Sequence, residues 1–201
     1  YFGENGNNTP RQKRFLSEVQ QGITPSTVWD FSEVGHTDEG KKETTKLFNS
    51  AVFDYPKPIR LLKRILEISN LTNDTILDFF AGSGTTLHAT MALNAEDGGN
   101  RQCILVTNNE NKIAEEVTYE RNKRVIQGYT NAKGEQVEGL VNNNLRYFQA
   151  DFVPSERTEI NRRLLTARST ELLCIKEDCF LDVTKDYNIK ERQAKLFTNG
   201  L

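Results

Sequence analysis

The residues with the clearest chemical potential lie in and after a short apolar segment, residues 75–80, in the stretch TILDFFAGSGTTLHAT. Asp78 stands within this segment, and Gly82 and Gly84 flank Ser83 directly after it. The order predicts a strand, a glycine-rich turn and a helix. Such a unit can bind the polar end of a nucleotide-like ligand, because free amide groups point outward at a helix N-terminus. Glycine also allows a ligand to approach the backbone closely.

The turn matches neither of two common phosphate-binding patterns. The dinucleotide pattern GxGxxG needs glycine where this chain has Leu87, and a P-loop needs a lysine that the turn lacks. Asp78 can accept either from a cationic amine of a ligand or from the N–H groups of the turn. Glu110 follows a second apolar segment, residues 102–109, and is placed to accept from a ribose diol. S-adenosylmethionine has the matching features: an ammonium group, a carboxylate and a ribose, without phosphate.

These residues also have purely structural interpretations. A GxG turn can be no more than a turn, Asp78 can be a cap, and Glu110 can be an acid favoured by the helix dipole. Lys57 can meet the carboxylate of the ligand or only water, and Phe80 can contact the ligand or pack in the core. The complete order of strand, acid, glycine turn, helix, strand and acid is more specific than any one of its parts.

Other chemically active residues give weaker signals. The basic residues Arg121, Lys123 and Arg124 are more typical of a solvated helix face than of a DNA contact. His36 and His88 are the two histidines, and two isolated histidines do not predict a metal site. We expect His88 on a helix surface near the turn.

The hydrophobic pattern predicts an α/β fold. In chain order we expect an amphipathic helix opened by Pro58 and running to 69, strands at 75–80 and 102–109, helices at 85–94 and 111–128, a strand at 145–153, and one or two helices at 155–178. Apolar strands separated by helices indicate a parallel sheet with both faces covered. Right-handed crossovers place consecutive strands side by side. The result is about half of a doubly wound sheet, with its ligand crevice at the carboxyl ends of the strands.

We expect three regions along the chain. Residues 1–26 are polar and form an N-terminal arm, residues 27–180 form the ligand-binding part, and residues 181–201 are a C-terminal tail. Within the central region, residues 27–50 predict an apolar cluster followed by an exposed charged loop, and residues 128–144 predict a polar loop.

The composition limits the class of protein. The 201 residues suffice for one domain with a sizeable core, and 26 basic against 28 acidic residues give a net charge of −2. This balance is not typical of a protein that wraps DNA. No apolar run is long enough to span a membrane, no signal peptide is recognisable, and the odd number of cysteines fits reduced thiols. Together these features predict a cytoplasmic protein.

The motifs resemble those of bacterial amino-methyltransferases that act on DNA. DFFAGSGTT, residues 78–86, resembles their cofactor-binding motif, and FDYPKPIRLLKRIL, residues 53–66, resembles the motif that precedes it in the permuted β class. TVWDFSEVGHTDEGKKETTKLF and TYERNKRVIQGY further resemble the Mod (modification) subunit of type III restriction–modification systems. The resemblance covers residues 24–180.

This resemblance implies an N6-adenine DNA methyltransferase that uses S-adenosylmethionine on a Rossmann-like class I sheet. It implies cofactor-binding roles for the residues of the two motifs and of the next strand end: Lys57, Pro58, Asp78, Phe80, Ala81, Gly82, Ser83, Gly84, Thr85 and Glu110. It further implies DNA as a partner, and a restriction (Res) subunit as a possible one.

One departure from the family pattern concerns catalysis. The family holds the target amine with an Asp-Pro-Pro-Tyr type tetrapeptide, and no two prolines are adjacent in this sequence. In the β class the catalytic half comes first, and this chain starts at Tyr1. We therefore expect the cofactor-binding C-terminal part of a Mod subunit, with no catalytic residues of its own and no activity alone. The alternative is a non-catalytic Mod-like domain that docks a restriction subunit or another Mod chain.

The expected half-sheet also has a consequence for association. In the family fold the strand at 75–80 lies centrally, between the strand at 102–107 and the strand that carries the catalytic motif. Without that second neighbour, the strand leaves an open edge that recruits partners. We therefore expect the chain to associate with itself and with the catalytic half of the enzyme.

Overall fold

A computed structural model describes Phe15, Ser17, Gly22 and residues 24–69, 72–190 and 194–200. The chain divides into two compact units, residues 1–147 and 148–201. Most of the expected N-terminal arm, residues 1–26, lies outside the described residues. The expected boundaries at 26 and 180 stay predictions.

The first unit contains most of the regular structure. Its helices are α1 (Phe31–Val34), α2 (Thr37–Phe48), α3 (Ile59–Ser69), α4 (Thr85–Asp97) and α5 (Glu120–Gln127). A 3-10 turn, η2 (Glu110–Lys112), and a π-helical segment, η3 (Ile113–Tyr119), lead into α5. Its strands are β1 (Thr75–Asp78), β2 (Gln102–Leu105), β3 (Tyr129–Thr130) and β4 (Gln136–Val137). The expected helix over 58–69, the two expected strands and the expected helix after the turn are all present in shortened or slightly extended form.

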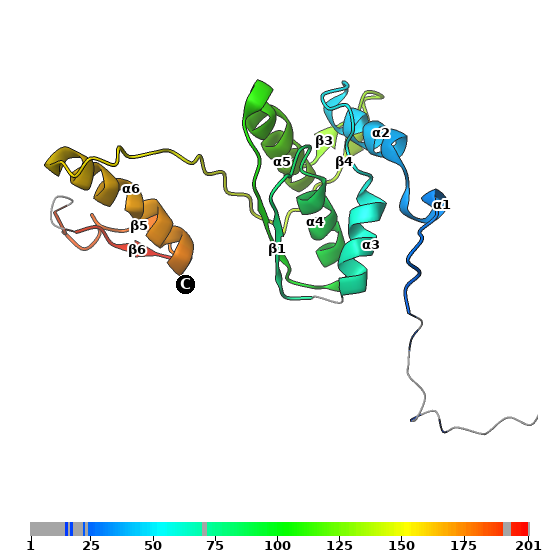
Figure 1. Ribbon diagram of the computed structural model, residues 1–201, viewed down its shortest axis with the longest axis horizontal. Helices are drawn as coiled ribbons and strands as arrows, with labels where there is room; N and C mark the ends of the chain where they lie inside the picture. The colour runs from blue at the N-terminus through cyan, green and yellow to red at the C-terminus, as the bar shows by residue number, and fades with distance from the viewer. Residues whose placement is uncertain are drawn as a thin grey trace, which may run out of the picture. The chain divides into compact units, whose positions relative to one another are not determined.

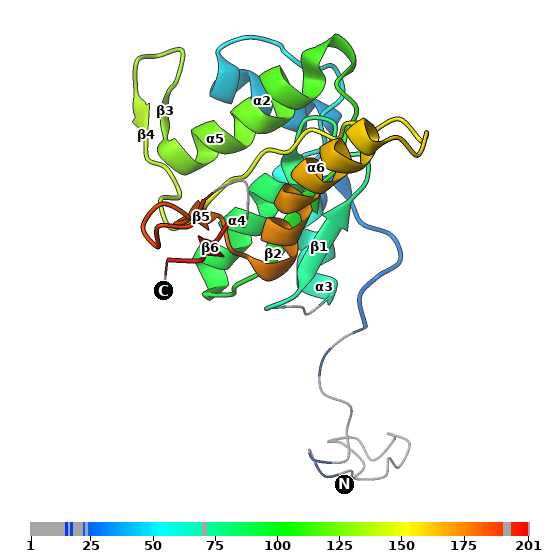
Figure 2. The ribbon, with the colours of Figure 1, turned by 90° about the vertical axis from the view of Figure 1, so that its left-hand side faces the viewer.

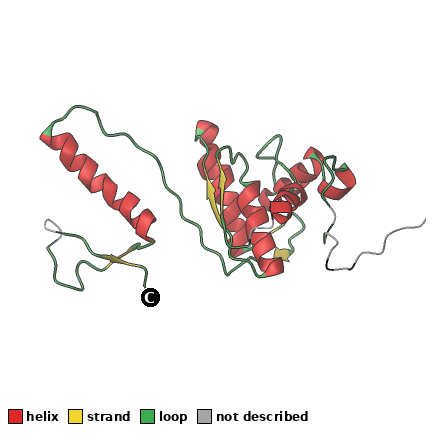
Figure 3. Ribbon diagram, turned by 60° about the horizontal axis from the view of Figure 1, so that its bottom comes forward, coloured by secondary structure: helices red, strands yellow, loops and turns green. Residues whose placement is uncertain are grey.

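The central element is a parallel pair of strands joined through a helix. β1 pairs with β2 in register from Thr75–Gln102 to Asp78–Leu105, and α4 connects the two strands. Figure 3 shows the strand pair along one side of the helices of this unit. The architecture is therefore mixed α/β with a small parallel sheet, as the hydrophobic pattern predicts.

Only one face of this sheet is covered within the described part of the unit. Ile76 packs against the cluster around Ala89, whereas Leu77 and Ile104 are 50% and 52% exposed. Side chains alternate between the two faces of a strand, so the exposed residues share the opposite face. The expectation that helices cover both faces is wrong for this unit, because the described helices that contact the strand pair lie on one side (Figure 3).

The hydrophobic core is built around α4, which stands between α3 and α5 (Figure 1). On one side Ala89 and Leu93 pack with Leu66 of α3. On the other side Met91 packs with Val125 of α5 and with Leu47 of α2. A helix that is apolar nearly all round is stable only when it is enclosed, and this explains the weak amphipathic pattern of α4.

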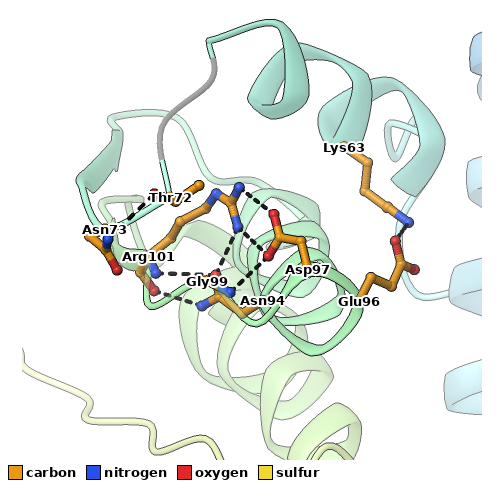
Figure 4. Close-up of polar contacts among 8 residues, drawn as sticks. All are labelled: Lys63, Thr72, Asn73, Asn94, Glu96, Asp97, Gly99 and Arg101. Atoms are coloured by element: carbon orange, nitrogen blue, oxygen red, sulfur yellow. Dashed lines mark hydrogen bonds and ion pairs between the residues drawn. The ribbon is translucent and has the colours of Figure 1, made fainter.

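A polar cluster closes the connection from α4 to β2 (Figure 4). Arg101 is 7% exposed, and its guanidinium donates to both carboxylate oxygens of Asp97, at 3.0 and 2.7 Å. The hydrogen bonds from Arg101 lower the pKa of Asp97 to about 2. Asn94 accepts from the backbone N–H of Arg101 and donates to its carbonyl. The start of β2 is thus fixed to the last turn of α4.

The expected charged loop at 27–50 is wrong, because most of it forms α1 and α2. His36 caps α2, accepting from the N–H of Glu39 at 3.3 Å, and Asn49 ends it in a left-handed conformation. Glu39 accepts from the guanidinium of Arg60 on α3 through both oxygens, at 2.7 and 2.6 Å. The charges that resemble a solvated loop in the sequence are thus the caps and cross-links of a short helical region.

The expected strand at 145–153 is also wrong, since none of these residues is in a strand. A strand needs a partner for its backbone groups, and this segment spans the division between the two units. By contrast, the expected loop at 128–144 contains the short hairpin β3–β4, in which Tyr129 pairs with Val137.

The second unit consists of one helix and one hairpin. α6 (Glu159–Glu177) begins at Thr158, whose side chain accepts from the N–H of Asn161, and it fulfils the expectation of a helix in 155–178. β5 (Leu181–Asp182) pairs antiparallel with β6 (Phe197–Thr198). Across both units, no helix in the described ranges has the length and apolar character that crossing a membrane requires.

Candidate functional site

The turn after β1 is shaped by Asp78. One carboxylate oxygen accepts from the N–H of Phe80 at 3.0 Å, and the other accepts from the hydroxyl of Thr86 at 2.5 Å. The backbone of Asp78 also bonds to Val106, which extends the register of the sheet beyond the strands. Of the two roles considered for Asp78, the structure shows the one in which the carboxylate orients the turn.

Two glycines give the turn its conformation. Gly82 and Gly84 have φ values of +50° and +74°, in the left-handed region that favours glycine. A Cβ on Gly84 would lie 2.5 Å from the side-chain nitrogen of Asn122, so α5 packs directly on the turn. The N–H groups of Gly82 and Ser83 donate to no acceptor in the described part of the chain. Gly82 is partly exposed and Ser83 is 3% exposed, and these two amides lack an acceptor that the described residues would supply.

A buried arginine donates hydrogen bonds to the side chains of the turn. Arg121 of α5 is 1% exposed. Its Nη1 donates to the hydroxyl of Thr85 at 2.8 Å and to that of Ser83 at 3.2 Å. The same nitrogen lies 3.4 Å from the hydroxyl of Thr44 on α2. One guanidinium therefore joins α2, α5 and the glycine turn.

The charge of Arg121 dominates the electrostatics around the turn. Burial lowers the pKa of Arg121 to about 10, and Glu43 acts in the opposite direction. Burial raises the pKa of Glu43, whose carboxylate accepts from the N–H of Ile59 at the start of α3. His88 faces Arg121 at 3.5 Å, and burial together with that positive charge lowers its pKa to about 3. His88 is therefore neutral near pH 7.

The other expected site residues lie around this centre. Ala81, Ser83 and Thr85 are buried within the turn, and Pro58 is buried just before α3. Phe80, by contrast, is 93% exposed, and Lys57 and Glu110 are also exposed. The structure thus brings the turn residues together on a rigid base. Their roles toward a cofactor stay predictions.

The segment that carries Glu110 has an unusual backbone. Asn111 and Lys112 follow it with φ values of +50° and +58°, although neither is glycine. Left-handed non-glycine residues cost free energy and concentrate at functional sites. Asn109 stabilises this bend, accepting from the N–H of Ala114 and donating to Glu115.

Two sequence-based placements in this region are wrong. Arg121 does not belong to a solvated face, and His88 is a partly buried neighbour of Arg121 and not a surface residue. The signal that could identify Arg121 is its spacing, because Thr118, Arg121 and Val125 follow one another at intervals of three and four residues and share the buried face. An arginine on the buried face of a helix, in a chain that also has a turn rich in hydroxyl side chains, indicates a buried guanidinium that donates to those hydroxyls.

Comparison with known proteins identifies the class. Residues 4–139 match the family model for DNA methylases of the N6 and N4 methyltransferase type. This match covers more than half of the chain, and the chain therefore belongs to the DNA methylase family. The match includes β1, the glycine turn, α4, β2 and the bend after Glu110.

Individual relatives point in the same direction. The chain is 44% identical over 123 residues to the Mod subunit of the type III restriction–modification enzyme StyLTI of Salmonella typhimurium, covering 59% of this chain and 18% of that protein. It is 38% identical over 114 residues to the type II methyltransferase M.KpnI of Klebsiella pneumoniae, covering 57% and 27%. It is 35% identical over 86 residues to the Mod subunit of EcoPI of Escherichia phage P1, covering 43% and 13%. These matches confirm the resemblance to DNA methyltransferases, including type III Mod subunits, and each spans less than a third of the relative.

The two ends of α4 offer a matched test of the turn. Gly84 and Gly98 cap the same helix with nearly the same backbone conformation, but a Cβ meets Asn122 only at Gly84 and open space at Gly98. We expect Gly98→Ala to lower the free energy of unfolding by about 1 kcal/mol, the cost of a left-handed alanine. Gly84→Ala should cost about 1–3 kcal/mol more, because the Asn122 side chain must leave its hydrogen bonds to Gly84 and Thr118. Urea denaturation measures both, and equal costs would show that α5 does not pack on the turn as described.

The neutral state of His88 predicts a pH dependence of stability. The pKa is about 3 in the folded chain and 6.5 in its unperturbed state. The unfolded chain therefore binds more protons below pH 6.5, and stability is lost as the pH falls from 6.5 toward 3. Between pH 7 and 5 the histidine should contribute a loss of about 1–2 kcal/mol.

His88→Gln should remove this contribution, so that the free energy of unfolding falls less between pH 7 and 5 than in the wild type. Denaturation at both pH values measures the difference, and the NMR signal of the His88 ring should not titrate over this range. Equal slopes in the two proteins, or a ring that titrates near pH 6.5, would contradict the burial of this side chain.

Proposed function

We propose that this chain is the S-adenosylmethionine-binding C-terminal portion of a type III, site-specific adenine-N6 DNA methyltransferase. The observation that carries the proposal is the glycine turn, with two free amides and a rigid base, within a chain of the DNA methylase family. The sheet would be the cofactor-binding half of a Rossmann-like class I methyltransferase fold. The proposed location is the bacterial cytoplasm.

The residues around the turn fit the proposed cofactor. The amides of Gly82 and Ser83 can donate to its oxygens. The absence of a Cβ at Gly82 lets the Phe53 ring pack against the turn, since such a Cβ would lie 3.3 Å from that ring. Glu110 is exposed and can accept from the ribose hydroxyls. S-adenosylmethionine, when bound, supplies the methyl group. The described residues contain no group of three or more His, Cys, Asp or Glu that could hold a metal ion.

The roles of the remaining residues follow from their positions. Lys57 is exposed next to the buried Pro58 and can pair with the carboxylate of the cofactor. Phe80 presents its ring to solvent and can pack on the adenine, since aromatic faces stack well on bases. Asp78 orients the turn by accepting from Phe80 and Thr86, and the remaining lone pairs of its two oxygens can accept from the ammonium group of the cofactor.

The partners proposed for the whole protein are duplex DNA, the catalytic half of the methyltransferase and a restriction subunit. Among the described residues β1 pairs with β2 alone, so its other edge and the exposed face with Leu77 and Ile104 are suited to the catalytic half or to self-association. A second candidate function is a non-catalytic domain of Mod type that docks another subunit. The exposed apolar face is equally consistent with a cofactor-binding portion that contacts its catalytic half and with a docking domain. Cofactor affinity is therefore the property that discriminates between the two functions.

Cofactor binding tests the first function. We expect the wild-type chain to bind S-adenosylmethionine in calorimetry, and Glu110→Ala to weaken binding about 10- to 100-fold, since it removes a charge-assisted hydrogen bond. Asp78→Ala should weaken binding as well, because the turn loses its two acceptors. Glu116→Ala is the matched control, since it removes an exposed acid from the same segment. Unchanged affinity in both test variants would contradict the site, and no binding by the wild type would favour the docking domain.

The chain should not methylate DNA by itself. Methyl transfer needs a group that holds the flipped adenine in line with the methyl group, and this sequence lacks the tetrapeptide that does so in the family. Incubation of the purified chain with duplex DNA and labelled S-adenosylmethionine measures transfer. Label in the DNA above that of a heat-denatured sample would refute this expectation.

A further inference from the structure

A lysine-rich groove lies between α2 and the β3–β4 hairpin, away from the residues assigned to the cofactor. It has a volume of about 730 Å³. Its walls include Lys41, Lys42 and Lys46 of α2 and, opposite them, Lys133 of the hairpin loop. Figure 2 shows α2 and the hairpin at the same end of α5. Four ammonium groups thus surround one concave surface.

The charge of this groove is largely uncompensated. None of the four ammonium groups lies within 4.0 Å of a carboxylate in the part of the chain that the structure describes. The groove contains two acids, Asp38 and Glu135. Glu135 already accepts from the side-chain amide of Asn131 at 2.7 Å. The groove therefore carries a net positive charge, on a chain whose net charge is −2.

Both walls of the groove are held in place. Asn131 is buried and accepts through its side chain from the N–H groups of Lys133 and Glu135, which fixes the hairpin loop. Asn49, at the end of α2, donates to the carbonyl of Thr130 at 3.0 Å and so connects the two walls. The lysines consequently project from a preformed surface and not from a flexible tail.

Helix α2 has one buried face and one exposed, lysine-rich face. Gly40, Thr44 and Leu47 are buried, and a Cβ on Gly40 would lie 2.4 Å from the carbonyl oxygen of Pro56. This close packing orients Lys42 and Lys46 outward, because residues three to four apart share a helix face. From Lys41 to Lys46 the axial rise is about 7.5 Å, which spans two to three phosphates at about 3.4 Å of rise per nucleotide in one DNA strand.

We propose that this groove binds the sugar–phosphate backbone of duplex DNA. Lysine ammonium groups are point charges suited to single phosphate oxygens, whereas reading bases relies on the bidentate geometry of arginine, asparagine or glutamine in a groove of the DNA. The groove contains no arginine and no aromatic side chain, and the side chains of its two asparagines, Asn49 and Asn131, already bond to the hairpin. It therefore positions the duplex independently of base sequence. The proposal rests on the proposed function in one respect, the choice of DNA as the polyanion.

The test is binding of a fluorescent duplex of arbitrary sequence to the full chain, measured by anisotropy from 50 to 200 mM salt and without cofactor. The triple variant K41Q/K46Q/K133Q removes two charges from the α2 wall of the groove and one from the hairpin wall. The control K63Q/K112Q/K123Q makes the same change in net charge at lysines that already pair with Glu96, Glu116 and Glu120. A third variant, K41R/K46R/K133R, keeps the charge of the groove. Circular dichroism confirms that each variant is folded.

We expect the groove variant to bind at least about tenfold more weakly at 50 mM salt and to lose about two to three units of the slope of log Kd against log salt. The control and the arginine variant should retain the wild-type slope. An equal loss in the groove variant and the control would overturn the proposal. So would a wild-type chain that does not bind the duplex, or one that binds a polyglutamate peptide with the same affinity.

The result is separable from the test of the proposed function. S-adenosylmethionine binding should be the same in the groove variant and the wild type, because no groove residue belongs to the turn or to the segment of Glu110. Loss of cofactor binding in Glu110→Ala with intact DNA binding supports both sites. If the cofactor does not bind the wild type but the duplex binds through the lysines, the groove stands and the cofactor site fails.

Discussion

The arrangement of the first unit depends on one buried cation. Arg121 is enclosed with hydroxyl partners from Ser83, Thr85 and Thr44, and its Nε has no hydrogen-bond partner in the described part of the chain. Burying a charge with incomplete compensation is costly, and the site persists because three elements converge on the same group. Displacing the turn, α2 or α5 would therefore remove at least one hydrogen-bond partner of this buried guanidinium.

Local elements around the turn could be predicted from the sequence because their signals are local. The apolar run at 75–78, the glycines at 82 and 84 and the helical pattern after them depend on residues that are close in the chain. The same holds for α3, where apolar spacing follows directly after Pro58. The family also could be predicted, since its motifs are contiguous and the turn is the most specific of them.

Other features could not be predicted because they depend on distant partners. The spacing of Arg121 with Thr118 and Val125 indicates the buried face of the helix, but the partners that stabilise a buried guanidinium, the hydroxyls of Ser83 and Thr85, lie 36 to 38 residues earlier in the chain. The charged segment that forms α2 is stabilised by Arg60, which bonds to Glu39 from 21 residues further along the chain. The residues at 145–153 have the composition of a strand, but composition alone does not supply a neighbouring strand.

Helix α2 contributes to both surfaces, because its Thr44 contacts Arg121 near the glycine turn and its lysines line the groove. The hydroxyl of Thr44 lies beside Arg121 under the glycine turn, and three of the four lysines of the groove, Lys41, Lys42 and Lys46, lie on the same helix within three residues of it. A displacement of α2 by a bound polyanion would be felt at the turn, and a ligand that stiffens the turn would restrain α2. Thermodynamic linkage requires any such effect to be reciprocal, so the coupling free energy between the two surfaces has one value from either side. Because α2 contributes a residue to each surface, it is the element through which such a coupling would act.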